Sequence, residues 1–136
     1  MKTLLVAHGA TLAAFLVLDA IWLSRMADTL YRPTMGDMLL EGFRSAPALL
    51  FYGIYVVGLV HFGVKPGLDG GAMATLANAA LFGFVAYATY DLTNQATLKN
   101  WSTILTLADL AWGTFVSAAS ASVGRVATLW LAPPVA

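Results

Sequence analysis

Two short motifs in the chain place an aspartate and a tryptophan three residues apart. Asp19 and Trp22 form the first motif, DAIW, and Asp109 and Trp112 form the second, DLAW. Residues three apart share one face of a helix, so each motif presents a carboxyl group and an indole together. Such a pair suits proton exchange or cation binding, and it equally suits fixing two helices to one another through hydrogen bonds.

A third carboxyl group, Asp91, follows Tyr90 where an apolar run ends in the sequence YDLTN. Thr93 and Asn94 can satisfy the carbonyl groups that are freed at a helix end, so we expect the helix to stop there. The sequence leaves two roles open for Asp91. It is either a boundary residue that reaches water or part of a cavity beneath the other two carboxyl groups.

The composition indicates which solvent surrounds these residues. Of 136 residues, 60% are hydrophobic and only 10% are charged, with a mean hydropathy of +0.77. A soluble domain of this size could not bury so much apolar surface, so the chain is predicted to be an integral membrane protein. A spanning helix needs about 20 mostly apolar residues. Four stretches qualify, and together they form a single domain over 1–136: 3–24, 46–65, 71–92 and 102–125.

The connections between these stretches are short. KPGLDGG at 65–71 predicts a tight turn, and TNQATLKNW at 93–101 predicts a short loop. In the longer segment 25–45, Thr34 and Asp37 resemble a capping box, and apolar residues that follow fall on one helical face. The predicted fold is therefore all-α: a four-transmembrane-helix bundle with a short interfacial helix between helices 1 and 2.

An even number of spans would place both termini on one side of the membrane and all three motif aspartates in the opposite half. The side with the termini carries three basic residues, and the other side carries four: Lys2, Lys65 and Arg125 against Arg25, Arg32, Arg44 and Lys99. This bias is too small for the positive-inside rule to fix the orientation.

A charged side chain at the centre of a bilayer costs about 2.5 to 3.5 kcal/mol on insertion scales. If the three carboxyl groups converge, they form a site for proton coupling or for a cation. Alternatively, each is neutralised by an arginine of segment 25–45 or hydrogen-bonded to an indole or to Tyr87, Tyr90 or Asn94, which would fix helix packing. Tyr31 and Tyr52 are expected to be interfacial belt residues. The candidate ligand or proton site consists of Asp19, Trp22, Tyr87, Tyr90, Asp91, Asn94, Asp109 and Trp112.

Several other classes of site are not expected. The chain has no cysteine, and His8 and His61 have no acid or thiol near them in the predicted arrangement, so no metal site is expected. A net charge of zero without a basic run argues against nucleic-acid binding. The sequence contains no phosphate-binding glycine loop and no hydrolase motif, and no cofactor is expected.

The segments YDLTNQATLKNW, DLAWG and DAIWL together resemble the bacterial membrane-protein family described as domain of unknown function 2177. The resemblance covers nearly the whole chain. It implies a four-helix integral protein of the bacterial inner membrane, and it assigns no activity. Its motif positions are Asp19, Trp22, Tyr90, Asp91, Thr93, Asn94, Asp109, Trp112 and Gly113.

Three functions remain open from the sequence. The first is a pocket that binds or transports a small cationic or amphipathic ligand, in a protein that forms a homodimer in order to enclose a path. The second is a membrane-embedded enzyme, or the partner of one, that acts on lipid with Asp109 as general acid or base. The third is a structural or assembly protein, in which every aspartate should be paired.

Overall fold

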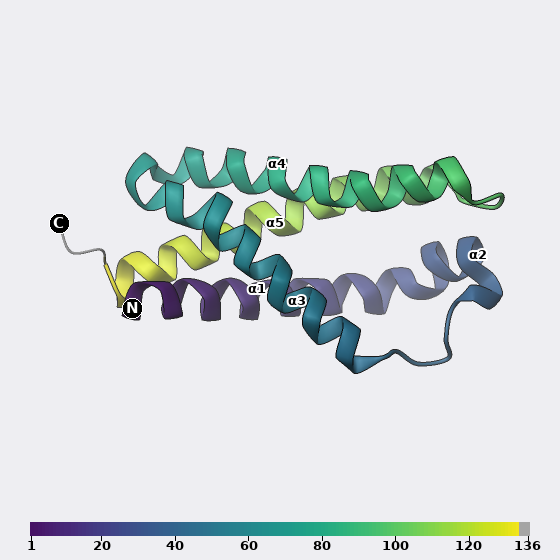
Figure 1. The fold of residues 1–136 in the computed structure, drawn as a ribbon, viewed down its shortest axis with the longest axis horizontal. Coiled ribbons are helices and arrows are strands. Elements are labelled where there is room, and N and C mark those ends of the chain that lie inside the picture. The colour runs from purple at the N-terminus through teal and green to yellow at the C-terminus, as the bar shows by residue number, and fades with distance from the viewer. Residues whose placement is uncertain (134–136) are drawn as a thin grey trace.

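The computed structural model describes residues 1–133, and this part of the chain is mainly helical, with no strand. The chain begins and the described part ends at the same end of the molecule, whereas segment α2 and the connection between α4 and α5 lie at the opposite end (Figure 1). The four long helices are α1 (Lys2–Met26), α3 (Ser45–Leu59), α4 (Lys65–Thr97) and α5 (Thr103–Leu131).

Three helical segments are long and apolar enough to cross a membrane: Lys2–Met38, Ser45–Thr97 and Thr103–Leu131. The first and the last contain the predicted spans 3–24 and 102–125. The predicted spans 46–65 and 71–92 both fall within the second segment, which is 53 residues long.

The second segment folds back on itself at Gly71. This residue has a φ of 86°, which interrupts α4 and which glycine adopts without the steric penalty of a Cβ atom. On either side of it the chain packs antiparallel, because Gly67 lies against Thr75 and Gly63 lies against Ala79. The predicted turn at 65–71 is therefore helical up to its last residue.

The predicted helix after Pro33 differs from the structure. The chain continues from α1 through a π-helical turn η1 (Ala27–Tyr31), α2 (Arg32–Met35) and a 3₁₀ turn η2 (Gly36–Met38). Thr34 lies inside α2 and caps nothing, and regular helix ends at Gly36, which has a φ of 50°. Because residues 39–44 are not helical, Phe43 does not belong to a common helical face with Met35.

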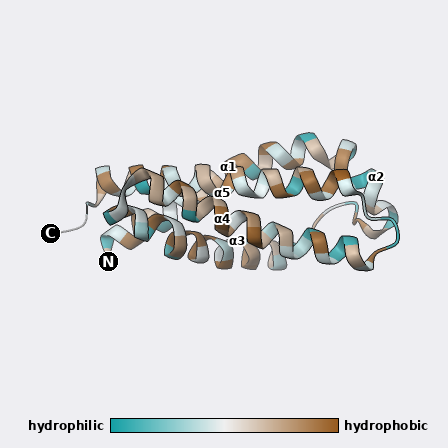
Figure 2. Ribbon diagram, turned by 90° about the horizontal axis from the view of Figure 1, so that it is seen from above, coloured by the Kyte–Doolittle hydropathy of each residue, from teal (hydrophilic) through white to brown (hydrophobic). Residues whose placement is uncertain are grey.

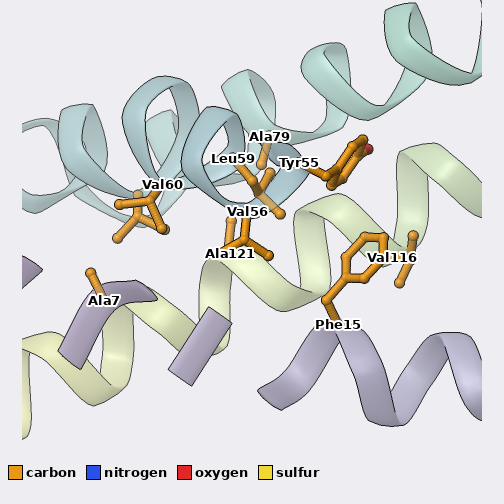
Figure 3. Packing of buried hydrophobic residues seen from close by; sticks show 10 residues of the cluster. Ala7, Phe15, Tyr55, Val56, Leu59, Val60, Ala79, Val116 and Ala121 are labelled. Atoms are coloured by element: carbon orange, nitrogen blue, oxygen red, sulfur yellow. The ribbon is translucent and has the colours of Figure 1, made fainter. Parts of the chain in front are cut away.

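The interior combines apolar and polar side chains. An apolar cluster joins α1, α3, α4 and α5 around Phe15, Leu59 and Val116 (Figure 3). Nine buried residues are polar or charged, whereas many large apolar side chains are exposed on the outer helix faces (Figure 2). This distribution suits a lipid environment, in which outward apolar residues need no cover and polar groups must find partners inside.

Helix α4 packs most closely against α5 where both lack a side chain. A Cβ atom at Gly83 would lie 2.2 Å from the carbonyl oxygen of Gly113, and one at Gly113 would lie 2.2 Å from the ring of Tyr87. Small residues allow backbones to approach in this way in membrane bundles. The contact fixes the register of the two helices that carry Asp91 and Asp109.

Candidate functional site: a buried carboxyl and aromatic cluster

Asp19 connects three helices through its carboxyl group. On α1 it is buried, and it accepts a hydrogen bond from the Tyr52 hydroxyl of α3 at 2.7 Å. Its other oxygen accepts from the indole N–H of Trp112 on α5 at 3.3 Å. Tyr52 is thus a hydrogen-bond donor to the cluster, which the belt assignment from the sequence missed.

Asp109 on α5 is 4% exposed and is held by a residue from the segment after α1. The Tyr31 hydroxyl donates to its Oδ1 atom at 2.5 Å, and this hydroxyl in turn accepts from the Trp22 indole at 2.8 Å. Tyr31 ends the π-helical turn η1, so its direction does not follow the regular spacing of α1. No feature of the sequence indicated this contact.

The two D-x-x-W motifs meet directly. The indole rings of Trp22 and Trp112 stack with centroids 4.4 Å apart and planes 7° from parallel. Each tryptophan bonds toward the other motif, since Trp112 donates to Asp19 and Trp22 reaches Asp109 through Tyr31. The predicted convergence of the motifs in one half of the molecule is therefore present in the structure.

Asp91 is the most unusual of the three carboxyl groups. Its side chain is fully buried, and neither of its oxygen atoms has a hydrogen-bond partner in the described part of the chain. The expected helix end near Asp91 is wrong, because α4 continues to Thr97. Of the two roles left open for Asp91, the boundary residue that reaches water does not fit its buried position. Thr93 does not stop the helix either, since its hydroxyl donates to the Thr89 carbonyl one turn earlier.

The register of α4 and α5 places Asp91 opposite Asp109. Gly83 of α4 contacts Ser117 of α5. Tyr87, four residues later in α4, contacts Gly113, four residues earlier in α5. The next step in this register brings Asp91 to the level of Asp109. Further along, the Gln95 side chain donates to Thr103 at 2.9 Å, so the two helices stay adjacent up to the connection between them.

No basic side chain neutralises these carboxyl groups. Over residues 1–133 the one ion pair joins Arg32 to Asp28 at 2.7 Å, and both of these side chains are exposed. Neutralisation of the motif aspartates by arginines of segment 25–45 is therefore wrong for this structure. Asp19 and Asp109 have hydrogen-bond donors instead. The Trp112 indole agrees with the predicted alternative, whereas the tyrosine donors are Tyr52 and Tyr31 and not Tyr87 or Tyr90.

A cavity of about 340 Å³ opens beside Asp109. Its lining residues come from α3, α4 and α5: Phe51, Tyr55, Ala86, Tyr87, Tyr90 and Asp109. A second cavity of about 540 Å³ lies under residues 39–43 and is lined in part by Tyr31 and Tyr90. Tyr31 and Asp109, whose side chains share a hydrogen bond, thus line different cavities.

The remaining predicted residues lie at the edge of this cluster. Tyr90 is 53% exposed and contacts the ring of Trp101 edge to face at 5.7 Å. Asn94 lies beside Tyr90, one turn beyond it, and does not line the cavity. Among residues 1–133 no three histidine, cysteine, aspartate or glutamate side chains are grouped as metal ligands.

Comparison with known proteins assigns the chain to a family. No curated protein and no solved structure compared with the chain matches it. A family model described as predicted membrane protein (DUF2177) matches residues 4–126, which include both D-x-x-W motifs and the YDLTN segment. The chain therefore belongs to this family of predicted membrane proteins, in agreement with the resemblance found in the sequence.

Proposed function

We propose that the chain crosses a bacterial inner membrane four times, with both termini on one side. The 53-residue segment Ser45–Thr97 is more than twice as long as one crossing requires, and it folds back at Gly71. The chain also begins and leaves the described range at one end of the molecule (Figure 1). Helix α2 and residues 39–44 then lie at the interface on the opposite side.

Within this bundle, the acidic and aromatic cavity binds a small cationic or amphipathic ligand, and a proton is exchanged when the ligand binds. The single observation that carries this proposal is Asp91, which is fully buried without a hydrogen-bond partner. The register of α4 and α5 puts it on the side of Asp109. Two neighbouring carboxyl groups in an apolar interior are stable only if one of them is protonated or a cation lies between them. A site that binds either a proton or a cation can exchange one for the other.

The groups around the carboxyl pair support this exchange. Asp19 of α1 adds a third acid, and Tyr31 of η1 donates a hydrogen bond to Asp109. Further titratable neighbours are Tyr55 of α3 and Tyr87 and Tyr90 of α4. Since no lysine, arginine or histidine of residues 1–133 pairs with these acids, a bound cation would meet uncompensated negative charge.

A second candidate function is favoured by one contact. The phenol of Tyr31 and the carboxyl of Asp109 lie 2.5 Å apart between two cavities, an arrangement suited to general acid and base catalysis on a lipid. A purely structural role is less well supported, because such a role leaves the unpartnered Asp91 without a reason.

The test uses the full chain in nanodiscs of zwitterionic lipid, with tetraphenylphosphonium as the probe cation. In weakly buffered solution near pH 7, we expect binding of the probe to release protons. Asp91→Asn and Asp109→Asn should each weaken binding about tenfold or more and abolish proton release. The matched control is Asp69→Asn, because Asp69 is an exposed acid distant in sequence from the cluster.

Two results would overturn the ligand-binding proposal. The first is equal affinity of the probe for wild type and both variants. The second is binding without any proton release at several pH values. Hydrolysis or modification of added lipid that requires both Tyr31 and Asp109 would instead support the enzymatic candidate.

A further inference from the structure

The walls of the cavity beside Asp109 consist largely of aromatic rings. Phe51 and Tyr55 come from α3, and Tyr87 and Tyr90 come from α4. The rings of Phe51 and Tyr55 have centroids 5.4 Å apart, and the ring of Tyr55 meets that of Tyr87 at 6.4 Å and 83°. Because the rings of Phe51, Tyr55 and Tyr87 are inclined to one another, the cavity wall presents both ring faces and ring edges.

The single charged residue in the lining is Asp109. Its Oδ1 atom accepts the Tyr31 hydroxyl, and its Oδ2 atom has no hydrogen bond to any residue of 1–133. The carboxyl group therefore has an oxygen available for a ligand. Asp91 lies opposite it on α4, fully buried, and adds negative charge to the same region.

We propose that this cavity is selective for hydrophobic organic cations with a quaternary or tertiary ammonium group, which enter sideways from the bilayer between α3 and α4. This inference rests on the proposed function of the cavity and names the class of its ligand. Aromatic faces attract such cations through the ring quadrupole, and the attraction increases when water is excluded. A neighbouring carboxylate supplies the compensating charge.

The composition of the walls excludes other ligand classes. A metal ion such as Mg²⁺ or Ca²⁺ needs several oxygen ligands, and here the lining offers one carboxyl group and a few phenols. An anion would meet Asp109 and Asp91 without a basic partner. A cavity of about 340 Å³ is at the lower end of the range for small-molecule sites, about 300 to 1,000 Å³.

The entry direction follows from the arrangement of α3 and α4. The two helices lie close together at the end where the chain passes from α3 into α4, and they diverge toward the other end of the molecule (Figure 1). The cavity has lining residues from both helices. Phe51 and Tyr90, one from each helix, are 44% and 53% exposed, whereas Tyr55 is buried deeper in the cavity. The rim therefore consists of exposed aromatic side chains, which an amphipathic molecule in the bilayer can reach without crossing water.

The experiment compares benzyltrimethylammonium with neopentylbenzene, its neutral isostere in which carbon replaces nitrogen. Both compounds compete against radiolabelled benzyltrimethylammonium for the full chain in zwitterionic nanodiscs, at matched mole fractions in the lipid and with empty nanodiscs subtracted. We expect the neutral isostere to compete at least about tenfold more weakly. Phe51→Leu and Tyr90→Leu should each weaken cation binding about threefold to tenfold, and Tyr90→Phe, which keeps the ring, should weaken it less than Tyr90→Leu does.

Phe62→Leu is the control, since Phe62 is an exposed ring of η3 (Val60–Val64) that does not line this cavity. Equal competition by the two isosteres, or no effect of either leucine variant, would overturn this inference. The outcome is separable from that of the proposed function. Proton release that depends on Asp91 and Asp109, combined with no preference for the cation, would retain the exchange site and reject the ligand class.

Discussion

Trp112 donates its indole N–H to Asp19 at 3.3 Å, so the tryptophan of one D-x-x-W motif bonds to the aspartate of the other. The reciprocal connection runs through a third residue, since Trp22 donates to Tyr31 and Tyr31 donates to Asp109. The motifs are thus not two independent pairs. They form one network that links α1 to α5, and the variants below test its parts.

Tyr31→Phe should destabilise the protein more than Tyr52→Phe. Removing the Tyr31 hydroxyl takes a donor from Asp109 and an acceptor from Trp22, whereas removing the Tyr52 hydroxyl takes one donor from Asp19. A hydrogen bond to a charged group contributes about 1.5 to 3 kcal/mol, and a neutral one contributes about 0.5 to 1.5 kcal/mol. Thermal unfolding of the detergent-solubilised variants measures the difference, and the reverse order would contradict the network.

Asp91→Leu should leave the protein at least as stable as wild type, whereas Asp19→Leu should destabilise it. Asp91 has no hydrogen-bond partner to lose, and its replacement removes a buried carboxyl group. Asp19→Leu would leave a tyrosine hydroxyl and an indole without their acceptor, at a cost of about 1 to 3 kcal/mol for each buried donor. Unfolding of Asp91→Leu at a lower temperature than wild type would identify Asp91 as a structural residue.

Gly113→Ala should separate α4 from α5. The added methyl group would lie 2.2 Å from the ring of Tyr87, so the ring or the helix must move, at a cost of about 1 to 3 kcal/mol. Gly53→Ala is the control, because nothing lies within 4 Å of a methyl group there and alanine favours a helix by about 0.8 to 1.0 kcal/mol over glycine. Thermal unfolding should give opposite signs for the two variants, and equal destabilisation would argue against close packing at Gly113.

Single cysteines at positions 2, 97 and 131 should test the four crossings, and the natural chain has no cysteine to interfere. In right-side-out vesicles, we expect a membrane-impermeant maleimide to label positions 2 and 131 from one side and position 97 from the other. Labelling of 2 and 131 from different sides would remove the four-span proposal. A mixture of both patterns for every variant would show that the chain inserts in both orientations.

The positions of the helices could be predicted from the sequence better than their ends. Apolar runs located α1 and α5, and the spacing of the D-x-x-W motifs predicted that these motifs share a site. The end of α4 was predicted wrongly because the polarity of Thr93 and Thr97 was interpreted as a loop. In the structure their hydroxyls donate to carbonyl groups one turn earlier, at Thr89 and Thr93. Both threonines therefore lie within the helix, which continues past the predicted end.

The contributions of Tyr31 and Tyr52 could not be predicted from spacing. Tyr31 is the last residue of a π-helical turn, which changes the direction of its side chain relative to the spacing of α1. The position of Tyr52 relative to Asp19 depends on how α3 crosses α1, and a single sequence does not specify a crossing angle. For both residues an interfacial belt was the more frequent role of tyrosine in membrane helices.

The hydrogen bonds of Asp19 have a consequence for the order in which the protein is made. Both donors, Tyr52 and Trp112, are synthesised after the helix that carries Asp19, and Trp112 emerges 93 residues later. While translation proceeds, α1 must enter the bilayer with its carboxyl group unpartnered, at the cost that insertion scales give for an isolated aspartate. Asp19 therefore gains its first donor when α3 follows and its second only when α5 is made, so a nascent chain that stops before α5 would leave this carboxyl group with Tyr52 alone.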